Sequence, residues 1–378
     1  MINRLLTQTI KQKLGLKGKA IVLLGARQTG KTTLLKKVFE NKSRVLWLNG
    51  DEMDTIALFA NASSTRFREL FAGYSILVID EAQRIEDIGL RLKLITDQIP
   101  ELQVVVTGSS AFELSNRINE PLTGRKWEYN LYPLSFQELV NHYGFLEEKR
   151  LLRHRLVFGC YPEVVCSPGN EKNVLKQLTD SYLYKDILMW ERISKPEKLL
   201  SLLQALALQL GNEMSFNELG RLVGLDNQTV EKYIQLLEKT FVIFRLQAFS
   251  RNQRKELKRG RKIYFYDNGI RNSLIASFAQ PELRTDVGAL WENYLMSERI
   301  KFLHYNDIWA NRYFWRTQDQ QEIDYIEERD GVLYAWEFKW CTEKKVNLTK
   351  TFANAYPNHR FGVINPDNYD DFLLSKRV

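Results

Sequence analysis

One nine-residue stretch has the residue types and the spacing needed to hold a chain of phosphate groups. Residues 25–33 read Gly-Ala-Arg-Gln-Thr-Gly-Lys-Thr-Thr and fit the pattern G-x-x-x-x-G-K-[ST]. The glycines let backbone N–H groups converge on a polyphosphate, and the positive end of the following helix adds to the attraction. In this pattern the lysine contacts the β- and γ-phosphates and the next hydroxyl binds Mg²⁺. The stretch therefore predicts that ATP and Mg²⁺ bind at Gly25, Ala26, Arg27, Gln28, Thr29, Gly30, Lys31, Thr32 and Thr33.

The segments on either side of this loop favour the same interpretation. Residues 19–24 end in five apolar residues and predict a short buried strand, whereas residues 32–39 have the spacing of an amphipathic helix. A strand, a glycine loop and a helix in this order form a nucleotide cradle. The alternative is a glycine-rich turn that matches by accident, which average composition allows roughly once in a hundred chains of this length.

An acidic pair after the apolar run 75–79 predicts hydrolysis as well as binding. The run is typical of a central parallel strand, and Asp80 and Glu81 follow it. We expect Asp80 to hold the Mg²⁺ shell and Glu81 to polarise the attacking water. A P-loop kinase needs the first acid but has no general need of the second, and no acceptor site is evident. The remaining alternative is a strand that leads into a solvated, acidic helix start.

A third predicted strand, over 102–106, ends in polar residues suited to sensing the γ-phosphate. Ser109 and Ser110 are equally good candidates for this sensor. The alternative is that one of them caps the helix that begins near residue 112. Arg117 and Arg125 are candidates for an arginine that contacts the γ-phosphate, against the alternative of an ordinary surface arginine.

Composition limits the class of protein. The chain has 378 residues, enough for two or three domains, and its 44% hydrophobic and 26% charged residues are ordinary for a soluble protein. No apolar run approaches the ~18 residues that span a bilayer, and residues 1–14 do not resemble a signal peptide. Three scattered cysteines predict neither a disulfide frame nor a zinc knuckle. We expect a cytoplasmic protein, and the net charge of +8 suggests a polyanionic partner.

Changes in pattern along the chain predict four domains. Strands and helices alternate up to about residue 132, as a parallel α/β sheet requires, which gives an ATPase core over 1–134. Residues 135–196 are helical and predict a lid on the nucleotide side. Residues 197–284 predict three helices followed by two strands, the outline of a winged helix. Residues 285–378 predict a small mixed α/β domain.

The segment between the two strands of the predicted winged helix is strongly basic. Residues 251–262 contain seven basic residues and one acid. Such a wing would engage DNA phosphates and lose affinity as salt rises. The alternative is docking of a protein partner, because the helix predicted over 228–239 is not itself basic.

Two predicted strands in the tail carry carboxylates that face each other. Residues 322–328 and 332–340 are joined by an Asp-Gly pair, a preferred two-residue hairpin turn. Counting outward from this turn places Asp324 opposite Glu337 in a non-hydrogen-bonded pair. Two facing carboxylates repel each other and destabilise the sheet unless a positive charge lies between them.

Lys339 points to the same face of this hairpin, which resembles the metal-nuclease motif of restriction-endonuclease-like proteins. The resemblance implies that Asp324 and Glu337 hold Mg²⁺ and that Lys339 helps to orient an attacking water. Glu292, in the helix predicted over 288–302, is a further candidate ligand. The alternative is an exposed cluster in which Lys339 alone neutralises the acids.

The chain as a whole resembles one family of prokaryotic AAA-superfamily ATPases. The resemblance rests on GARQTGKTT, ILVIDEAQ, TGSSAFEL, LTGRKWEYNLYPLSFQEL and GCYPEVV, and it continues through YFYDNGIR, GALWENYL and the EID…EFK tail. The phosphate loop and the acidic run are shared by many ATPases, whereas PLSFQEL and GCYPEVV are more particular to this family. The resemblance implies an AAA-type core and an uncharacterised C-terminal domain with a restriction-endonuclease-like tail.

Two functions are consistent with these patterns. The first is an ATP-driven, DNA-associated enzyme with a metal-dependent nuclease tail. The second is a nucleotide switch that binds a protein partner and keeps the tail as an inactive scaffold. They differ in whether Asp324, Glu337 and Lys339 converge on a metal. Because AAA proteins often form rings, a homo-oligomer is a further candidate partner, and no membrane partner is expected.

Overall fold

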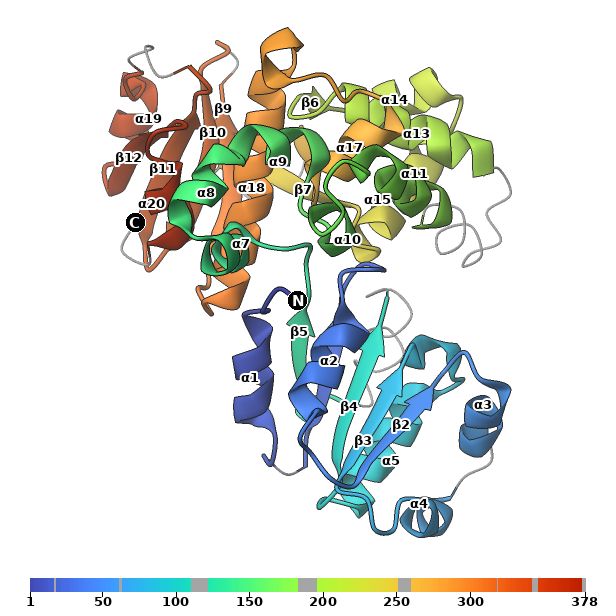
Figure 1. Cartoon of the computed structure of the whole chain (residues 1–378). Helices are drawn as coiled ribbons and strands as arrows, with labels where there is room; N and C mark the ends of the chain where they lie inside the picture. The colour runs from blue at the N-terminus through green and yellow to red at the C-terminus, as the bar shows by residue number, and fades with distance from the viewer. Residues whose placement is uncertain are drawn as a thin grey trace. The chain divides into compact units, whose positions relative to one another are not determined.

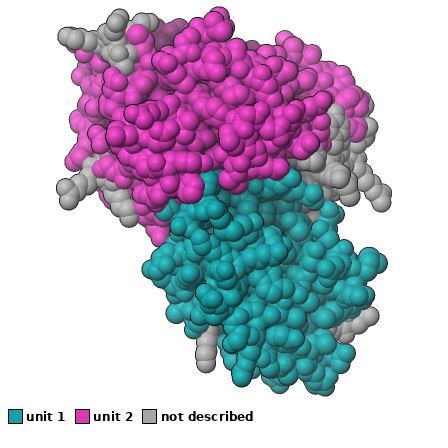
Figure 2. Space-filling view, viewed as in Figure 1, with its two compact units in different colours: residues 1–134, 239–241 teal, residues 135–238, 242–378 magenta. Residues whose placement is uncertain are grey.

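The computed structural model contains two compact units (Figure 2). Unit 1 comprises residues 1–134 and 239–241, and unit 2 comprises residues 135–238 and 242–378. The structure describes residues 1–16, 18–60, 63–109, 122–182, 196–250, 260–317, 319–341 and 346–375. Within these ranges, no helix has the length and the apolar character that crossing a lipid bilayer requires.

Unit 1 is built on a five-stranded parallel sheet with the strand order β2-β3-β4-β1-β5 (Figure 1). Its strands are β1 (Ala20–Leu24), β2 (Val45–Asn49), β3 (Ile76–Asp80), β4 (Gln103–Gly108) and β5 (Lys126–Asn130). Every residue of β1 and β4 is buried, as expected of strands covered on both faces. Because the strands are parallel, the loops that follow β1, β3 and β4 meet at one edge of the sheet.

The helices of unit 1 connect these strands. They are α1 (Leu6–Lys13), α2 (Lys31–Phe39), α3 (Met53–Ala60), α4 (Ser64–Leu70), the 3-10 turn η1 (Ala82–Arg84) and α5 (Ile88–Gln98). The strands and the helix predicted from the sequence around the phosphate loop and the acidic pair are therefore confirmed to within two residues. The α/β class of this part of the chain is confirmed with them.

Unit 2 begins with the helical segment that was predicted to be a lid. It contains α7 (Phe136–Tyr143), α8 (Phe145–Arg150), α9 (Leu152–Phe158), α10 (Pro162–Val165) and α11 (Glu171–Tyr182). Ser135 and Glu138 form a reciprocal cap at the start of α7. The N–H of Phe136 donates to the carboxylate of Glu298 at 2.6 Å, and α9 packs against α17 and α18. Within unit 2, the partners of this segment are thus helices of the C-terminal half. Its packing on the nucleotide side stays a prediction.

The next elements occur in the order predicted for a winged helix. They are α13 (Pro196–Leu208), β6 (Glu213–Met214), α14 (Phe216–Val223), α15 (Asn227–Lys239), β7 (Ile243–Ala248) and β8 (Arg261–Phe265). Ser215 caps α14 together with Glu218, and Gly224 ends this helix in the left-handed conformation. Residues 251–259, which form most of the predicted basic wing, lie outside the described residues. The winged-helix assignment stays a prediction.

One sheet runs through the two domains predicted in this half of the chain. The remaining elements are α17 (Asn268–Leu274), η3 (Pro281–Leu283), α18 (Val287–Tyr305), β9 (Asn311–Arg316), β10 (Glu322–Arg329), β11 (Val332–Phe338), α19 (Lys350–Ala355), β12 (His359–Ile364) and α20 (Tyr369–Leu374). The strand order is β12-β11-β10-β9-β7-β8-β6. Parallel pairing of β7 with β9, with Gln247 opposite Tyr313, joins the two sets of strands. The boundary predicted at 284/285 therefore does not divide the sheet.

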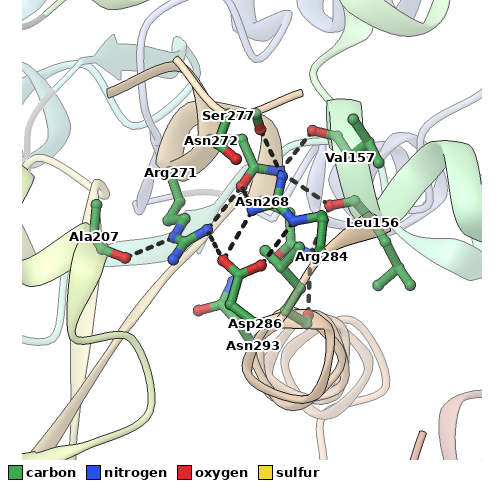
Figure 3. Close-up of polar contacts among 11 residues, drawn as sticks. Leu156, Val157, Ala207, Asn268, Arg271, Asn272, Ser277, Arg284, Asp286 and Asn293 are labelled. Atoms are coloured by element: carbon green, nitrogen blue, oxygen red, sulfur yellow. Dashed lines mark hydrogen bonds and ion pairs between the residues drawn. The ribbon is translucent and has the colours of Figure 1, made fainter. Parts of the chain in front are cut away.

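A buried polar network surrounds α17 and gives several residues in and next to the YFYDNGIR stretch a structural role (Figure 3). Asn268 and Asn272 donate to backbone carbonyls at the end of α9. Arg271 donates to a carbonyl of α13 and contacts the Asp286 carboxylate at 2.7 Å, and Asn293 of α18 donates to Asn268 at 2.6 Å. Buried polar groups are tolerated when they are hydrogen-bonded in this way. These residues therefore fix α9, α13 and α18 around α17.

The GCYPEVV stretch interlocks with the same region. Asp267 accepts hydrogen bonds from the N–H groups of Cys160 at 2.7 Å and Ile270 at 3.1 Å. A Cβ atom at Gly159 would lie only 2.0 Å from the Asp267 carboxylate, so this position requires glycine. Burial raises the pKa of Asp267 to about 6. Both stretches thus have a structural role within unit 2.

Candidate functional site

The predicted phosphate loop lies between β1 and α2 and has the backbone geometry of an anion cradle. Gly30 is left-handed with φ of 92° and precedes the first turn of α2, and Gln28 has φ of 58°. A Cβ atom at Gly25 would lie 2.2 Å from the carbonyl oxygen of Leu131, so glycine is required there. Successive backbone N–H groups in such conformations form concave sites for phosphate oxygens.

Lys31 is held inside this loop by the loop's own backbone. Its side chain is 95% buried (5% exposed), and Nζ donates to the carbonyl oxygens of Gly25 at 2.8 Å and Ala26 at 2.9 Å. Arg4 donates to the carbonyl oxygens of Thr29 at 2.6 Å and Tyr132 at 2.5 Å. The N-terminal segment thus fixes one side of the loop. The ammonium group of Lys31 lies where the loop backbone converges.

The structure brings together the two residues predicted to bind Mg²⁺. The Thr32 hydroxyl, in the first turn of α2, donates to Oδ2 of Asp80 at 2.6 Å. Asp80 is the last residue of β3, and its Oδ1 accepts from the Thr107 hydroxyl. A hydroxyl and a carboxylate are the hard oxygen ligands that Mg²⁺ prefers. The donor set therefore fits the ion.

Glu81 directly follows this carboxylate and has a constrained backbone. Its φ of 48° is left-handed, which is uncommon for a residue with a side chain. Its N–H donates to the Thr107 hydroxyl at 3.2 Å, and its carboxylate accepts from Nε2 of Gln83. The same Nε2 donates to the Ser109 hydroxyl at 3.1 Å. Gln83 therefore links the predicted water-activating residue to the predicted sensor.

The structure does not bring Arg125 to this site. Arg125 precedes β5, whose first residue Lys126 lies opposite Ala20 at the start of β1. The phosphate loop follows the other end of β1, so Arg125 lies at the opposite edge of the parallel sheet. Its Nε donates to Asp97 at 2.6 Å, in a partly exposed ion pair. We correct the phosphate-sensing assignment accordingly. The other candidates, Ser110 and Arg117, lie outside the described residues.

Several residues of the site were not singled out from the sequence. Thr107, Gln83 and Arg4 contact the loop or its acids, as described above. Gly50 is a fourth, because a Cβ atom there would lie 2.3 Å from the carbonyl oxygen of Glu81. Thr107 and Gln83 stand inside motifs that were recognised, so their polar side chains were an available signal. Arg4 and Gly50 carry no comparable local signal.

In the tail, the predicted Asp–Glu–Lys constellation converges. The hairpin register places Tyr325 opposite Trp336, so Asp324 and Glu337 are the next residues outward. Lys339 Nζ lies 2.6 Å from the Glu337 carboxylate and 3.5 Å from that of Asp324. Burial, reinforced by the Asp324 carboxylate, outweighs the lysine and raises the pKa of Glu337 to about 7.

Glu292, the further candidate ligand, has a different partner. Nζ of Lys262 lies 3.2 Å from the Glu292 carboxylate and 2.5 Å from the Glu322 carboxylate. The Tyr264 hydroxyl also donates to the Glu292 carboxylate, at 2.5 Å. Burial disfavours the charged form of Lys262. The negative charges of Glu292, Glu322 and Asp324 outweigh this effect and raise the pKa of Lys262. Across the described part of the chain, no group of three or more acidic, histidine or cysteine side chains is arranged to hold a metal ion.

Comparison with known families and structures indicates what kind of domain carries the phosphate loop. Residues 17–140 match the model of an AAA domain. Together with the phosphate loop and the acidic pair, this match identifies the type of domain in the N-terminal part of the chain. Residues 17–140 form an AAA domain. Beyond the AAA domain, residues 149–281 and 287–374 match two domains of unknown function, DUF8612 and DUF4143.

Relatives of this chain occur in bacteria. An uncharacterized protein of Mycobacterium tuberculosis is 25% identical over 338 residues, which cover 88% of this chain and 73% of the relative. An uncharacterized protein of Haemophilus influenzae is 25% identical over 364 residues, covering 86% of this chain and 85% of the relative. A Walker-type ATPase of Pyrococcus abyssi superposes with a TM-score of 0.51 at 17% identity, over 73% of this chain and 96% of that one. This structural likeness shows the fold alone.

Proposed function

We propose that the AAA domain binds ATP with Mg²⁺ and hydrolyses it to ADP and phosphate. The observation that carries this proposal is the contact between Thr32 and Asp80, beside a buried Lys31 and within the loop's backbone cradle. These groups supply what polyphosphate binding needs, which is a cation, backbone donors and oxygen ligands for Mg²⁺. Bound Mg²⁺ would neutralise charge on the phosphate oxygens.

The residues of the site would then have separate roles. Lys31 would leave its two backbone carbonyls and contact the β- and γ-phosphates. Thr32 and Asp80 would hold the Mg²⁺. Glu81 would accept a proton from a water that attacks the γ-phosphorus, while the bond from that phosphorus to the β–γ bridging oxygen breaks. Gln83 would orient the Glu81 carboxylate.

ATP turnover would drive a rearrangement of the basic C-terminal half. DNA remains our proposed partner for the basic segment 251–262. The support is the net charge of +8 and the six basic residues of the segment other than Lys262, which is buried against acidic side chains. Docking of a protein partner is the alternative. For the tail we propose a structural role, because ammonium groups already neutralise the carboxylates that a nuclease metal would need.

The test of ATPase function is a phosphate-release assay on the full chain. Glu81→Gln should retain ATP binding and lose turnover, since an amide cannot accept the proton. Glu86→Gln is a matched control, because Glu86 is an exposed acid a few residues further along. Equal rates of phosphate release by wild type and Glu81→Gln would refute the role given to Glu81, and absence of release by all three proteins would refute the ATPase proposal.

A further inference from the structure

The acidic cluster of the tail is formed by Glu292, Glu322, Asp324 and Glu337. It contains a lysine from a different part of the chain. Lys262 belongs to β8, whereas Glu292 lies on α18 and Glu322 on β10. These elements are brought together because β7 and β9 join their strands into one sheet. The ammonium group of Lys262 contacts both carboxylates, at 3.2 and 2.5 Å. Asp324 is close enough to add to their electrostatic effect on the lysine.

Most of the cluster is shielded from water, so the balance of its charges affects the stability of the fold. The exposed fractions of the side chains are 3% for Lys262, 16% for Glu292, 14% for Asp324 and 11% for Glu337, whereas Glu322 is 29% exposed. Carboxylates removed from water to this extent need a positive partner. In metal-dependent sites that partner is a divalent ion held by several oxygens around one point.

Here two ammonium groups occupy the positions between the carboxylates. Lys339 bridges Glu337 and Asp324, and Lys262 bridges Glu292 and Glu322. The backbone N–H of Phe338 also donates to Asp324 at 2.8 Å and takes up one of its oxygens. A tethered ammonium needs no association from solution, so it competes strongly with a free ion.

We propose that the Lys262 ammonium is the resident cation of this cluster and takes the place of a divalent metal. The tail then has the outline of a metal site in which a side chain supplies the charge. Two consequences follow. The wild-type cluster should not respond to divalent metal ions. Removing the charge of Lys262 should leave Glu292 without a cation and Glu322 with only Arg316, at 3.9 Å, and so create a metal site.

The test is thermal unfolding of the full chain with millimolar Mn²⁺ and with a chelator. It is run above pH 7, without nucleotide and in a Lys31→Ala background, so that the AAA domain contributes no metal site. Wild-type tail should show the same melting temperature in both conditions. Lys262→Met should melt lower than wild type in the chelator and rise in Mn²⁺, since a ligand stabilises the state that binds it.

Lys149→Met is a matched control. Lys149 is also a lysine paired with a carboxylate, that of Asp370 at 2.8 Å, but it lies outside the cluster. This variant should not gain a response to Mn²⁺. If Lys262→Met does not fold, the double variant Lys262→Met/Glu292→Gln should recover folding, because it removes the uncompensated charge together with its partner.

Three results would overturn the proposal. One is a Mn²⁺-dependent rise in the wild-type tail that is lost in Asp324→Asn, which would indicate a genuine metal site. Another is a folded Lys262→Met variant with no response to Mn²⁺. The third is a double variant that fails to recover folding where the single variant fails.

Discussion

Lys31→Ala tests the phosphate loop, and its effect can be worked out from the contacts of the lysine. In the structure, Nζ donates to two backbone carbonyls, at 2.8 and 2.9 Å. When ATP binds, these two hydrogen bonds are exchanged for contacts to phosphate oxygens, so the number of hydrogen bonds changes little. The gain is the attraction between the ammonium group and a negative charge, about 4 kcal/mol for unit charges 4 Å apart at an effective dielectric constant of about 20.

This energy corresponds to a loss of roughly 10³-fold in ATP affinity. Isothermal titration with ATP and Mg²⁺ measures it, and thermal unfolding without nucleotide checks that the variant is folded. Lys36→Ala is the matched control, because Lys36 lies on the exposed face of the same helix. A folded Lys31→Ala protein whose Kd rises by less than about tenfold would refute this account of the lysine.

Three further predictions concern unit 2. Arg299 and Glu327 are fully buried and contact each other at 2.6 Å, so Arg299→Met should cost about 3–5 kcal/mol in unfolding free energy, and Arg299→Met/Glu327→Met should recover most of it in urea titrations. A single variant that matches wild type would contradict this. The raised pKa of Glu337 means that its contribution to stability is present below about pH 4.5 and is lost as pH rises through about 7. Glu337→Gln should remove that part of the pH dependence of unfolding, and identical slopes in both proteins would rule the assignment out. Replacing four basic residues of the wing by serine should weaken duplex DNA binding and lower its salt slope by about one unit for each lost phosphate contact, measured by fluorescence anisotropy. An unchanged slope would favour protein docking; the four residues are Arg254, Lys255, Lys258 and Arg259.

The sequence predicted the nucleotide cradle well because its signals are local. The pattern from Gly25 to Thr32 specifies a loop conformation within a few residues, and the apolar runs beside it specify buried strands. The tail hairpin was predictable for the same reason. Its Asp-Gly turn has positive φ at both residues, which fixes the pairing of Arg329 with Val332.

Other features depend on where strands end and how they are ordered. β4 extends to Gly108, two residues beyond the predicted end, and so Thr107 lies in the strand beside Asp80. Arg125 precedes a strand that is parallel to β1, and strand direction alone places it away from the loop. That signal was present in the sequence but depends on the sheet being parallel throughout.

The contact between Lys262 and Glu322 had no signal in the sequence. The two residues are far apart along the chain and were expected in separate domains. The pairing of β7 with β9 joins their strands into one sheet. A buried ion pair between distant segments is a product of the tertiary fold, and residue spacing does not encode it.

The central claim is that this loop binds ATP and that Lys31 moves to do so. A crystal structure with Mg²⁺ and an ATP analogue that cannot be hydrolysed tests it most directly. We predict that Lys31 Nζ leaves the carbonyl oxygens of Gly25 and Ala26 and lies about 2.9 Å from a phosphate oxygen, with Thr32 and Asp80 in the Mg²⁺ coordination shell. A nucleotide bound elsewhere, or a bound nucleotide with Lys31 still on its two carbonyls, would contradict the account.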